Sequence, residues 1–218
     1  PWFIYEKLLS GLSEILPGHP IDNALRLFAR SPACELDRSP RLDHSSLNAS
    51  QQRAISLCCQ LNPALIWGPP GTGKTRTLAA LLAELLHQDR RILVTSTTNA
   101  AVDQALEQLA KHPEGRPFLH QHKVVRMGQN ARSHPKMTLQ KEQIIVVGEP
   151  TQLPPIVQSR DAFVQKALRR SMLAIAVPTP LTTHNVALLA TQYQMHPTIG
   201  DLISKLFYHG ALHSATTD

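Results

Sequence analysis

Cysteine and long apolar runs are scarce in this chain of 218 residues. Its three cysteines, Cys34, Cys58 and Cys59, are too few and too irregularly spaced for a disulfide framework or a structural zinc site. No run approaches the roughly 18 apolar residues of a membrane span, and no basic flank precedes an apolar stretch at the N-terminus. We therefore expect a soluble intracellular protein without membrane contact, in the cytoplasm or, in a eukaryotic cell, the nucleus.

Acidic residues are outnumbered by basic ones, 16 against 22, which gives a formal net charge of +6. Such a surface suits a polyanionic partner. A general contribution to solubility explains the charge equally well, because no dense block of Lys and Arg stands out. With 42% hydrophobic residues, the chain is long enough for one α/β domain with a core, or for one and a fraction.

The most informative stretch, 61–78, reads LNPALIWGPPGTGKTRTL. It contains the pattern G-x-x-x-x-G-K-T after an apolar run and before a helix-forming run, which is the strand, loop and helix context of a phosphate-binding P-loop. A glycine-rich turn that matches by chance is the alternative, and this context argues against it. The residues predicted to surround a nucleotide here are Gly68, Pro69, Pro70, Gly71, Thr72, Gly73, Lys74, Thr75 and Arg76.

These residue types have physical reasons to face a phosphate chain. Gly71 and Gly73 leave the backbone free to wrap the β-phosphate with N–H groups, and the following helix directs its positive end there. Lys74 is predicted to act as a mobile cation on the β- and γ-phosphates, and the Thr75 hydroxyl to hold Mg²⁺. The predicted cofactors are therefore ATP and Mg²⁺.

Apolar periodicity predicts alternating helices and strands. Helices are expected at 47–61 (capped by Asn48 or Ser50), 74–88, 99–110, 161–173 and 199–207, and strands at 64–67, 90–95, 143–148 and 186–190. This alternation predicts an α/β fold with a mostly parallel sheet and helices on both faces. Two short helices are expected within 1–30 and a linker at 31–46, whereas 111–141 give no firm prediction.

Four further segments resemble the superfamily 1 helicases of the DNA2/NAM7 type, which include the nonsense-mediated-decay helicase and senataxin. They are Leu47, Asn48 and Gln51, similar to the Q motif; 95–103, similar to motif Ia; 148–155, similar to motif III; and 192–197 with Phe207, Tyr208 and Gly210, similar to Q-Y-R-M-H-P and its trailing F-Y-x-G. The resemblance covers about 47–213. It implies a partial RecA-like P-loop ATPase domain at 47–218, ending where a second RecA-like domain begins, after a helical accessory segment and linker at 1–46.

The resemblance also implies roles for single residues. The amide of Gln51 would read the adenine edge. Gln152 would sense the γ-phosphate, which places it with Lys74 and Thr75 among the catalytic residues. Two simpler interpretations stay open, namely Gln51 as a surface residue and the motif Ia residues as an ordinary helix cap. The residues implied to contact the backbone of single-stranded DNA or RNA are Thr97, Thr98, Asn99 and Asp103.

Three positions depart from the family pattern. Glu149 replaces the usual Asp of motif III, which lengthens the carboxylate by one methylene group. Gln194, next to Tyr193, replaces an Arg that lies against the nucleotide in the family, and an amide supplies neither the charge nor the stacking of a guanidinium. Tyr193 and Gln194 remain predicted nucleotide-binding residues, with weakened affinity. Trp67 stands where the family often has a polar or small residue and is interpreted as a packing residue.

The family's Walker B segment, D-E-A-x-Q, is missing between Asp103 and Gly148. Hydrolysis of ATP needs one carboxylate for Mg²⁺ and another to orient the attacking water. Glu142 precedes a strand and Glu114 stands among loop residues, so neither is a convincing substitute. The sequence also shows no second RecA-like domain with its arginine finger. We expect feeble hydrolysis and no unwinding.

Three hypotheses follow. The first is the ATP-binding, N-terminal RecA-like domain of a DNA or RNA helicase. The second is a non-catalytic module that binds nucleotide and nucleic acid or serves as a scaffold. The third is a P-loop ATPase outside the helicases, such as an AAA+ or kinase-like protein, and the Q-L-P-P and Q-Y-Q-M-H-P segments weigh against it. The oligomeric state is left open.

Overall fold

The structure, a computed structural model, describes residues 33–96, 98–126, 143–150, 173 and 184–215. Its helices are α3 (Ala49–Gln60), α4 (Lys74–His87), α5 (Asn99–Lys111), α6 (Arg116–His120) and α9 (Pro197–Phe207). Its strands are β1 (Cys34–Glu35), β2 (Leu61–Asn62), β3 (Ala64–Trp67), β4 (Ile145–Gly148), β5 (Val186–Leu188), β6 (Thr191–Gln192) and β7 (His213–Ser214). The helices predicted within 1–30 and most of the helix predicted at 161–173 lie outside the described residues. No described helix is long and apolar enough to cross a membrane.

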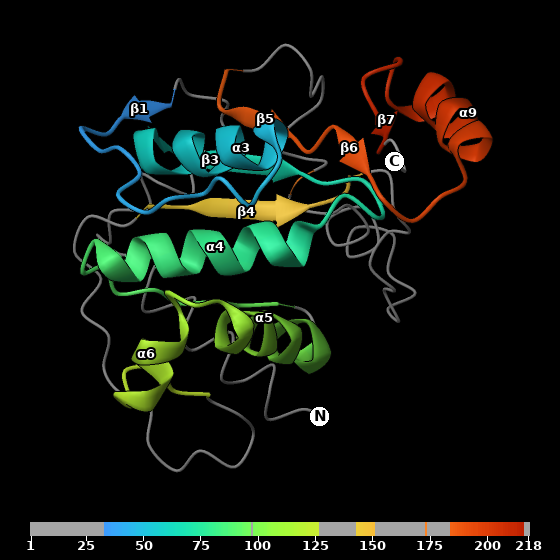
Figure 1. Cartoon of the computed structure of the whole chain (residues 1–218). Coiled ribbons are helices and arrows are strands. Elements are labelled where there is room, and N and C mark those ends of the chain that lie inside the picture. Colours follow the sequence, from blue (N-terminus) through green and yellow to red (C-terminus); the bar gives the residue numbers. More distant parts are fainter. Residues whose placement is uncertain (1–32, 97, 127–142, 151–172, 174–183, 216–218) are drawn as a thin grey trace, which may run out of the picture.

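A parallel sheet in the order β4-β3-β5 lies at the centre of the described residues (Figure 1). β3 pairs with β4 from Ala64 opposite Ile145 to Trp67 opposite Gly148. Its other edge pairs with β5. All four residues of β3 are buried, as expected for a strand with neighbours on both edges. The structure confirms the predicted parallel sheet and the predicted helices that correspond to α3, α4, α5 and α9.

Side chains of the sheet alternate between its two faces. On one face, Ile66 joins a core with Ile55 of α3 and Leu81 of α4. On the other face, Leu65 packs against Leu173, the one described residue of the helix predicted at 161–173. Both faces of the central strand are therefore covered by apolar side chains, which holds the loop that follows β3 at a defined place.

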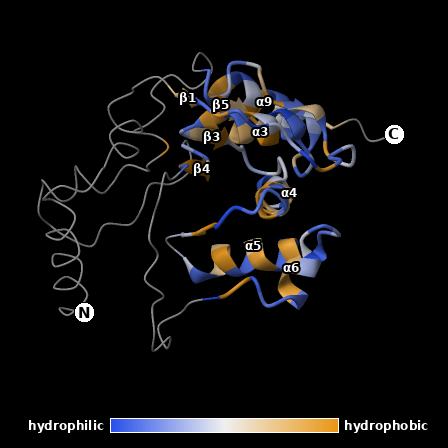
Figure 2. Ribbon diagram, turned by 90° about the vertical axis from the view of Figure 1, so that its left-hand side faces the viewer, coloured by the Kyte–Doolittle hydropathy of each residue, from blue (hydrophilic) through white to orange (hydrophobic). Residues whose placement is uncertain are grey.

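Helix α4 lies between the sheet and the pair α5 and α6 (Figure 2). Leu82 and Ala83 of α4 pack against Leu109 of α5. The short helix α6 follows α5 in a region where Gly115 and Pro117 interrupt the apolar period, which is why the sequence predicted no element there. Because α4 is buried on both sides, its N-terminus is a rigid platform.

The prediction of a strand at 90–95 is wrong. Residues 90–96 have no regular secondary structure, and Leu93 is 60% exposed. Ile92 and Val94 still pack against the apolar cluster of α4 and α5, so this segment partly buries every second side chain although it is not a strand. A strand also needs a hydrogen-bonding neighbour, and none of the described residues pairs with this segment.

Residues 31–46 are predicted as a linker, and their described part, 33–46, is attached to the domain. β1 pairs antiparallel with β2. The backbone N–H groups of Arg41 and Leu42 donate to the carboxylate of Glu84 on α4, at 2.8 and 2.9 Å, and His44 Nε2 lies 3.1 Å from it. Glu84 is fully buried. The domain boundary between 46 and 47 stays a prediction.

Candidate nucleotide-binding site

The loop between β3 and α4 has the backbone that its glycines permit. Gly71 and Gly73 both have a φ of 76°, in the left-handed region that side chains disfavour. Gly73 is the N-cap of α4, so the first N–H groups of that helix are directed toward the loop. A Cβ on Gly73 would lie 2.7 Å from the Gln51 amide nitrogen. The loop therefore requires glycine here for both conformation and space.

Lys74, the first residue of α4, lies across the loop. Its ammonium donates to the carbonyl oxygens of Gly68 at 2.6 Å and Pro69 at 3.2 Å. A Cβ on Gly68 would come within 2.2 Å of the lysine side chain, so only glycine leaves this path open. Burial lowers the pKa of Lys74, and the nearby Glu149 carboxylate opposes that shift. The structure thus holds a partly desolvated cation above the loop.

Three other predicted loop residues have distinct environments. Thr72 is fully buried, and its hydroxyl donates to the Pro69 carbonyl at 2.7 Å. Thr75 is half-buried, and its hydroxyl makes no hydrogen bond to any residue that the structure describes. Arg76 is exposed and donates to the carbonyl of Ser46 at 2.8 Å, on the α3 side of the loop. Thr75 is the one whose hydroxyl is left for a ligand.

Gln51 supports the P-loop from α3. Its side-chain oxygen accepts from the backbone N–H of Asn48 at 3.1 Å, and the Asn48 side chain accepts from the Gln51 backbone N–H at 2.9 Å, which forms a capping box. Its amide nitrogen donates to the Thr72 carbonyl at 3.1 Å. Gln51 is 3% exposed, so the interpretation as a surface residue is wrong. Adenine recognition by Gln51 stays a prediction.

The segment that follows β6 lies against the same loop. The backbone N–H of Tyr193 donates to the Gly71 carbonyl at 3.0 Å, and its hydroxyl accepts from Asn48 Nδ2 at 2.8 Å. A Cβ on Gly71 would come within 3.0 Å of the Gln194 Cβ. The structure therefore brings Tyr193 and Gln194 to the P-loop, although more than 100 residues separate them from it in sequence.

Gln192 organises this segment from inside. It is 1% exposed. Its amide oxygen accepts from the backbone N–H groups of Gln194 and Met195 at 2.9 and 2.6 Å, and its amide nitrogen donates to the Met195 carbonyl and the Ser214 hydroxyl. These four bonds make the turn after β6 rigid, which fixes how Tyr193 meets the loop.

Sequence reasoning missed a buried contact behind the P-loop. The indole N–H of Trp67 donates to Glu149 at 2.9 Å, and the Tyr208 hydroxyl donates to the other carboxylate oxygen at 3.1 Å. The two aromatic rings lie 5.5 Å apart. Glu149 is 8% exposed, so this pair of donors compensates a buried charge. The interpretation of Trp67 as a packing residue alone is therefore incomplete.

The motif Ia residues lie at the start of α5. Thr98 is its N-cap, with the hydroxyl 3.3 Å from the Ala101 N–H, so the ordinary helix-cap interpretation holds for it. Asn99 is exposed on the first turn. Asp103 pairs with Arg126 at 2.6 Å, which lowers the pKa of Asp103. Arg126 was not singled out from the sequence, because a single arginine in an irregular stretch gives no pattern.

Two predicted site residues, Gln152 and Thr97, lie outside the described residues. In the part of the chain that is described, no group of three or more His, Cys, Asp or Glu side chains is placed to hold a metal ion. Among the described acidic residues, Glu149 is the one that raises the pKa of Lys74. The geometry therefore provides a glycine-rich loop, a cation and a hydroxyl that makes no hydrogen bond to the described residues.

A parallel α/β sheet whose central strand ends in a glycine-rich loop and a helix N-terminus defines a P-loop protein with a RecA-like fold. Sequence comparison agrees, since two family profiles, each described as "AAA domain", match residues 46–144 and 168–218. The chain belongs to the superfamily 1 helicases of the DNA2/NAM7 type.

Three curated relatives illustrate this membership. The chain is 30% identical to "Regulator of nonsense transcripts 1" of Caenorhabditis elegans over 73% of its length. It is 35% identical to "DNA-binding protein SMUBP-2" of Mus musculus over 59%, and 38% identical to "DNA polymerase alpha-associated DNA helicase A" of Schizosaccharomyces pombe over 43%. Each match spans 13% of the relative, so the chain corresponds to about an eighth of these proteins.

Proposed function

We propose that this chain binds ATP with Mg²⁺ at its P-loop and single-stranded nucleic acid beside α5, as the nucleotide-binding part of a helicase-type motor. The observation that supports this most directly is the position of Lys74. Its ammonium donates to the carbonyls of Gly68 and Pro69, which are weaker partners than phosphate oxygens. A nucleotide would replace these carbonyls by its β- and γ-phosphates.

The other groups of the loop complete this role. Gly71 and Gly73 keep side chains away from the phosphates, and the N-terminus of α4 directs N–H groups toward them. The Thr75 hydroxyl would be a ligand of Mg²⁺, which supplies charge neutralisation when bound. Tyr193 and Gln194 border the loop through Gly71, so a nucleotide at the loop would contact this segment.

Nucleic acid is proposed to bind at the start of α5. The exposed Thr98 and Asn99 stand at a helix N-terminus, which favours a phosphate. Arg126, paired with Asp103 on the same helix, adds a cation nearby. The names of the relatives include DNA-binding and helicase activity, and the net charge of +6 agrees with a polyanionic partner.

A fluorescent ATP analogue tests the nucleotide part. Titration with and without Mg²⁺ compares the unmodified chain with Lys74→Ala and with Lys205→Ala, which removes an exposed lysine on α9. Losing charge-assisted bonds worth about 1.5–3 kcal/mol predicts roughly 10–100-fold weaker binding for Lys74→Ala and no change for the control. Absence of binding to the unmodified chain would overturn the proposal.

Phosphate release on the same samples tests turnover. We expect slow release that single-stranded DNA or RNA does not stimulate, because no Walker B segment was found in the sequence. Strong stimulation would show that a carboxylate outside the described residues completes the site, and the feeble-hydrolysis part of the proposal would be wrong.

A non-catalytic binding module is the second candidate function. The observation that favours it is that Glu149, the carboxylate acting on Lys74, already accepts bonds from Trp67 and Tyr208 on its two oxygens. A carboxylate held in this way is poorly placed to orient water. Partner or nucleic-acid binding that Lys74→Ala leaves unchanged would favour this candidate, whereas loss of residual turnover would favour the motor.

A further inference from the structure

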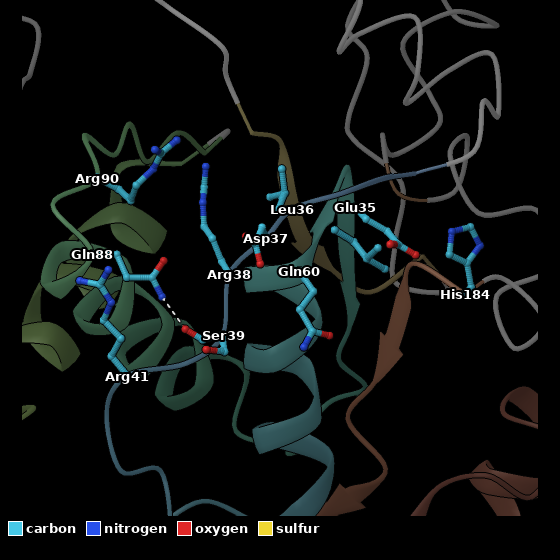
Figure 3. Close-up of a pocket in the computed structure, with 11 residues that line it drawn as sticks. Glu35, Leu36, Asp37, Arg38, Ser39, Arg41, Gln60, Gln88, Arg90 and His184 are labelled. Atoms are coloured by element: carbon cyan, nitrogen blue, oxygen red, sulfur yellow. Dashed lines mark hydrogen bonds between the residues drawn. The ribbon is translucent and has the colours of Figure 1, made fainter.

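A second basic site lies at the opposite end of the sheet from the P-loop. An open pocket of about 920 Å³ is formed between the 33–46 segment, the end of α3 and the residues after α4. Three arginines line it, namely Arg38, Arg41 and Arg90 (Figure 3). Gln60 and Gln88, from the C-terminal ends of α3 and α4, form part of its wall.

These arginines lack carboxylate partners among the described residues. The ion pairs among all the described residues are His44 with Glu84, His87 with Glu114 and Arg126 with Asp103. By contrast, the guanidinium of Arg38 reaches a neutral oxygen, Gln143 Oε1, at 3.5 Å, and that of Arg41 reaches the His87 carbonyl at 3.5 Å. Both contacts are at the long limit of a hydrogen bond.

The carboxylate of Glu84, which the backbone of Arg41 contacts, is already in use. Its oxygens accept from the backbone of Arg41 and Leu42, from Gln88 at 2.7 Å, and lie beside His44. The two acidic residues in the pocket lining are Asp37 and Glu35. Neither forms an ion pair with a described arginine, and Figure 3 shows Glu35 beside His184, at the far end from Arg90.

Arg38 and Arg90 are close enough to repel each other. Both are half-buried, and partial burial together with the Arg90 cation lowers the pKa of Arg38. Figure 3 draws the two guanidiniums on the same side of the pocket, and an anion bound between them would relieve their repulsion. The geometry of the pocket thus favours a ligand with several acceptor oxygens and at least one negative charge.

We propose that Arg38 and Arg90, with Arg41 at the rim, bind phosphate groups of a nucleic-acid strand. The planar fork of arginine matches phosphate oxygens. The pocket is larger than one phosphate group, and its described lining includes no Phe, Tyr or Trp for base stacking, so it fits the backbone and not the bases. This inference rests on the proposed nucleic-acid binding and adds a contact remote from α5.

Salt-dependent binding of a fluorescein-labelled oligothymidylate tests it. The double variant Arg38→Gln/Arg90→Gln is compared with Arg53→Gln/Arg91→Gln, which removes two exposed arginines outside the pocket. Each lost phosphate contact lowers the slope of log affinity against log salt by about 0.7, so two lower it by about 1.4 and weaken binding roughly 25-fold at about 0.1 M salt. The control is expected to show a smaller change in both quantities.

Equal effects in the two double variants would overturn the proposal, because they would show a general charge effect. Arg38→Lys/Arg90→Lys guards against misfolding. This variant retains both charges, so it is expected to keep most of the salt dependence of binding while it loses affinity. If its circular dichroism spectrum is unchanged but its slope is as low as that of the Gln variant, the phosphate assignment is contradicted.

Pyrophosphate separates this inference from the proposed function. Calorimetry is done in a Lys74→Ala background, where the P-loop is weakened. If the unmodified chain binds no oligonucleotide, the nucleic-acid part of the proposed function fails. If the chain then binds pyrophosphate and the Arg38→Gln/Arg90→Gln variant does not, the pocket binds a free phosphate compound, and the proposal that it binds a nucleic-acid strand is overturned. If pyrophosphate does not bind either, the assignment of a phosphate site to this pocket is itself overturned.

Discussion

The indole nitrogen of Trp67 lies 2.9 Å from a carboxylate oxygen of Glu149, which joins the ends of β3 and β4 behind the P-loop. The Tyr208 hydroxyl, just past α9, donates to the other oxygen of this carboxylate. One buried acidic side chain thus connects the nucleotide-binding strand, its neighbour and the segment after α9.

Trp67→Phe is expected to destabilise the domain by about 1–3 kcal/mol, because it leaves a buried carboxylate without one of its donors. Urea unfolding of Trp67→Phe, Glu149→Gln and the double variant measures the coupling between the two residues. The Gln amide oxygen can still accept the indole N–H, so a cost of Trp67→Phe that is the same with Glu149 and with Gln at that position would show that the carboxylate charge adds nothing to this hydrogen bond.

Gly73→Ala is expected to abolish nucleotide binding, because its Cβ would disfavour the left-handed φ that the loop needs here and would collide with the Gln51 amide. Gly210→Ala is the matched control, since Gly210 has a φ of 79° and open space around its Cβ position. Both variants should lose about 1–2 kcal/mol of stability from backbone strain. Only Gly73→Ala should lose binding of the fluorescent ATP analogue. Equal binding by the two variants would contradict the proposed role of the loop in nucleotide binding.

Glu84 makes stability depend on pH. Burial raises the pKa of this carboxyl, but hydrogen bonds from Arg41, Leu42, Gln88 and His44 outweigh burial, and the net pKa is lowered. A carboxyl whose pKa is lower in the folded than in the unfolded state stabilises the fold when the pH is above its unfolded-state pKa. This contribution is lost as the pH falls through the folded-state pKa. Glu84→Gln should therefore cost most near neutral pH and progressively less under acidic conditions. Urea unfolding across this range checks it, and a cost independent of pH would disagree.

Arg126→Gln is expected to weaken oligonucleotide binding roughly 5-fold at about 0.1 M salt, the electrostatic share of one phosphate contact. Asp103→Asn removes the competing carboxylate, so it should leave affinity unchanged or raise it. Fluorescence anisotropy measures both. An equal loss of affinity in the two variants would mean that binding requires the ion pair and that the Arg126 guanidinium alone is not the contact.

The P-loop was readable from the sequence because its chemistry is local. Gly71, Gly73, Lys74 and Thr75 are consecutive or nearly so, and a strand before and a helix after are predicted from a few neighbouring residues. The parallel sheet followed for the same reason, since a buried strand is a solid apolar run such as Ala64–Trp67. Local propensity also predicted a cap of α3 at Asn48 or Ser50, and the structure shows that it is Asn48.

Features that depend on long-range partners were decided only by the tertiary structure. Residues 90–95 have the composition of a strand, but a strand forms only where another strand accepts its hydrogen bonds. Trp67 and Glu149 are 82 residues apart, and the Arg38 and Arg90 pocket joins two segments that no motif connects. Sequence determined which residues form the P-loop, because one turn of backbone places them together; folding determined which distant charges meet, because burial and packing set their distances.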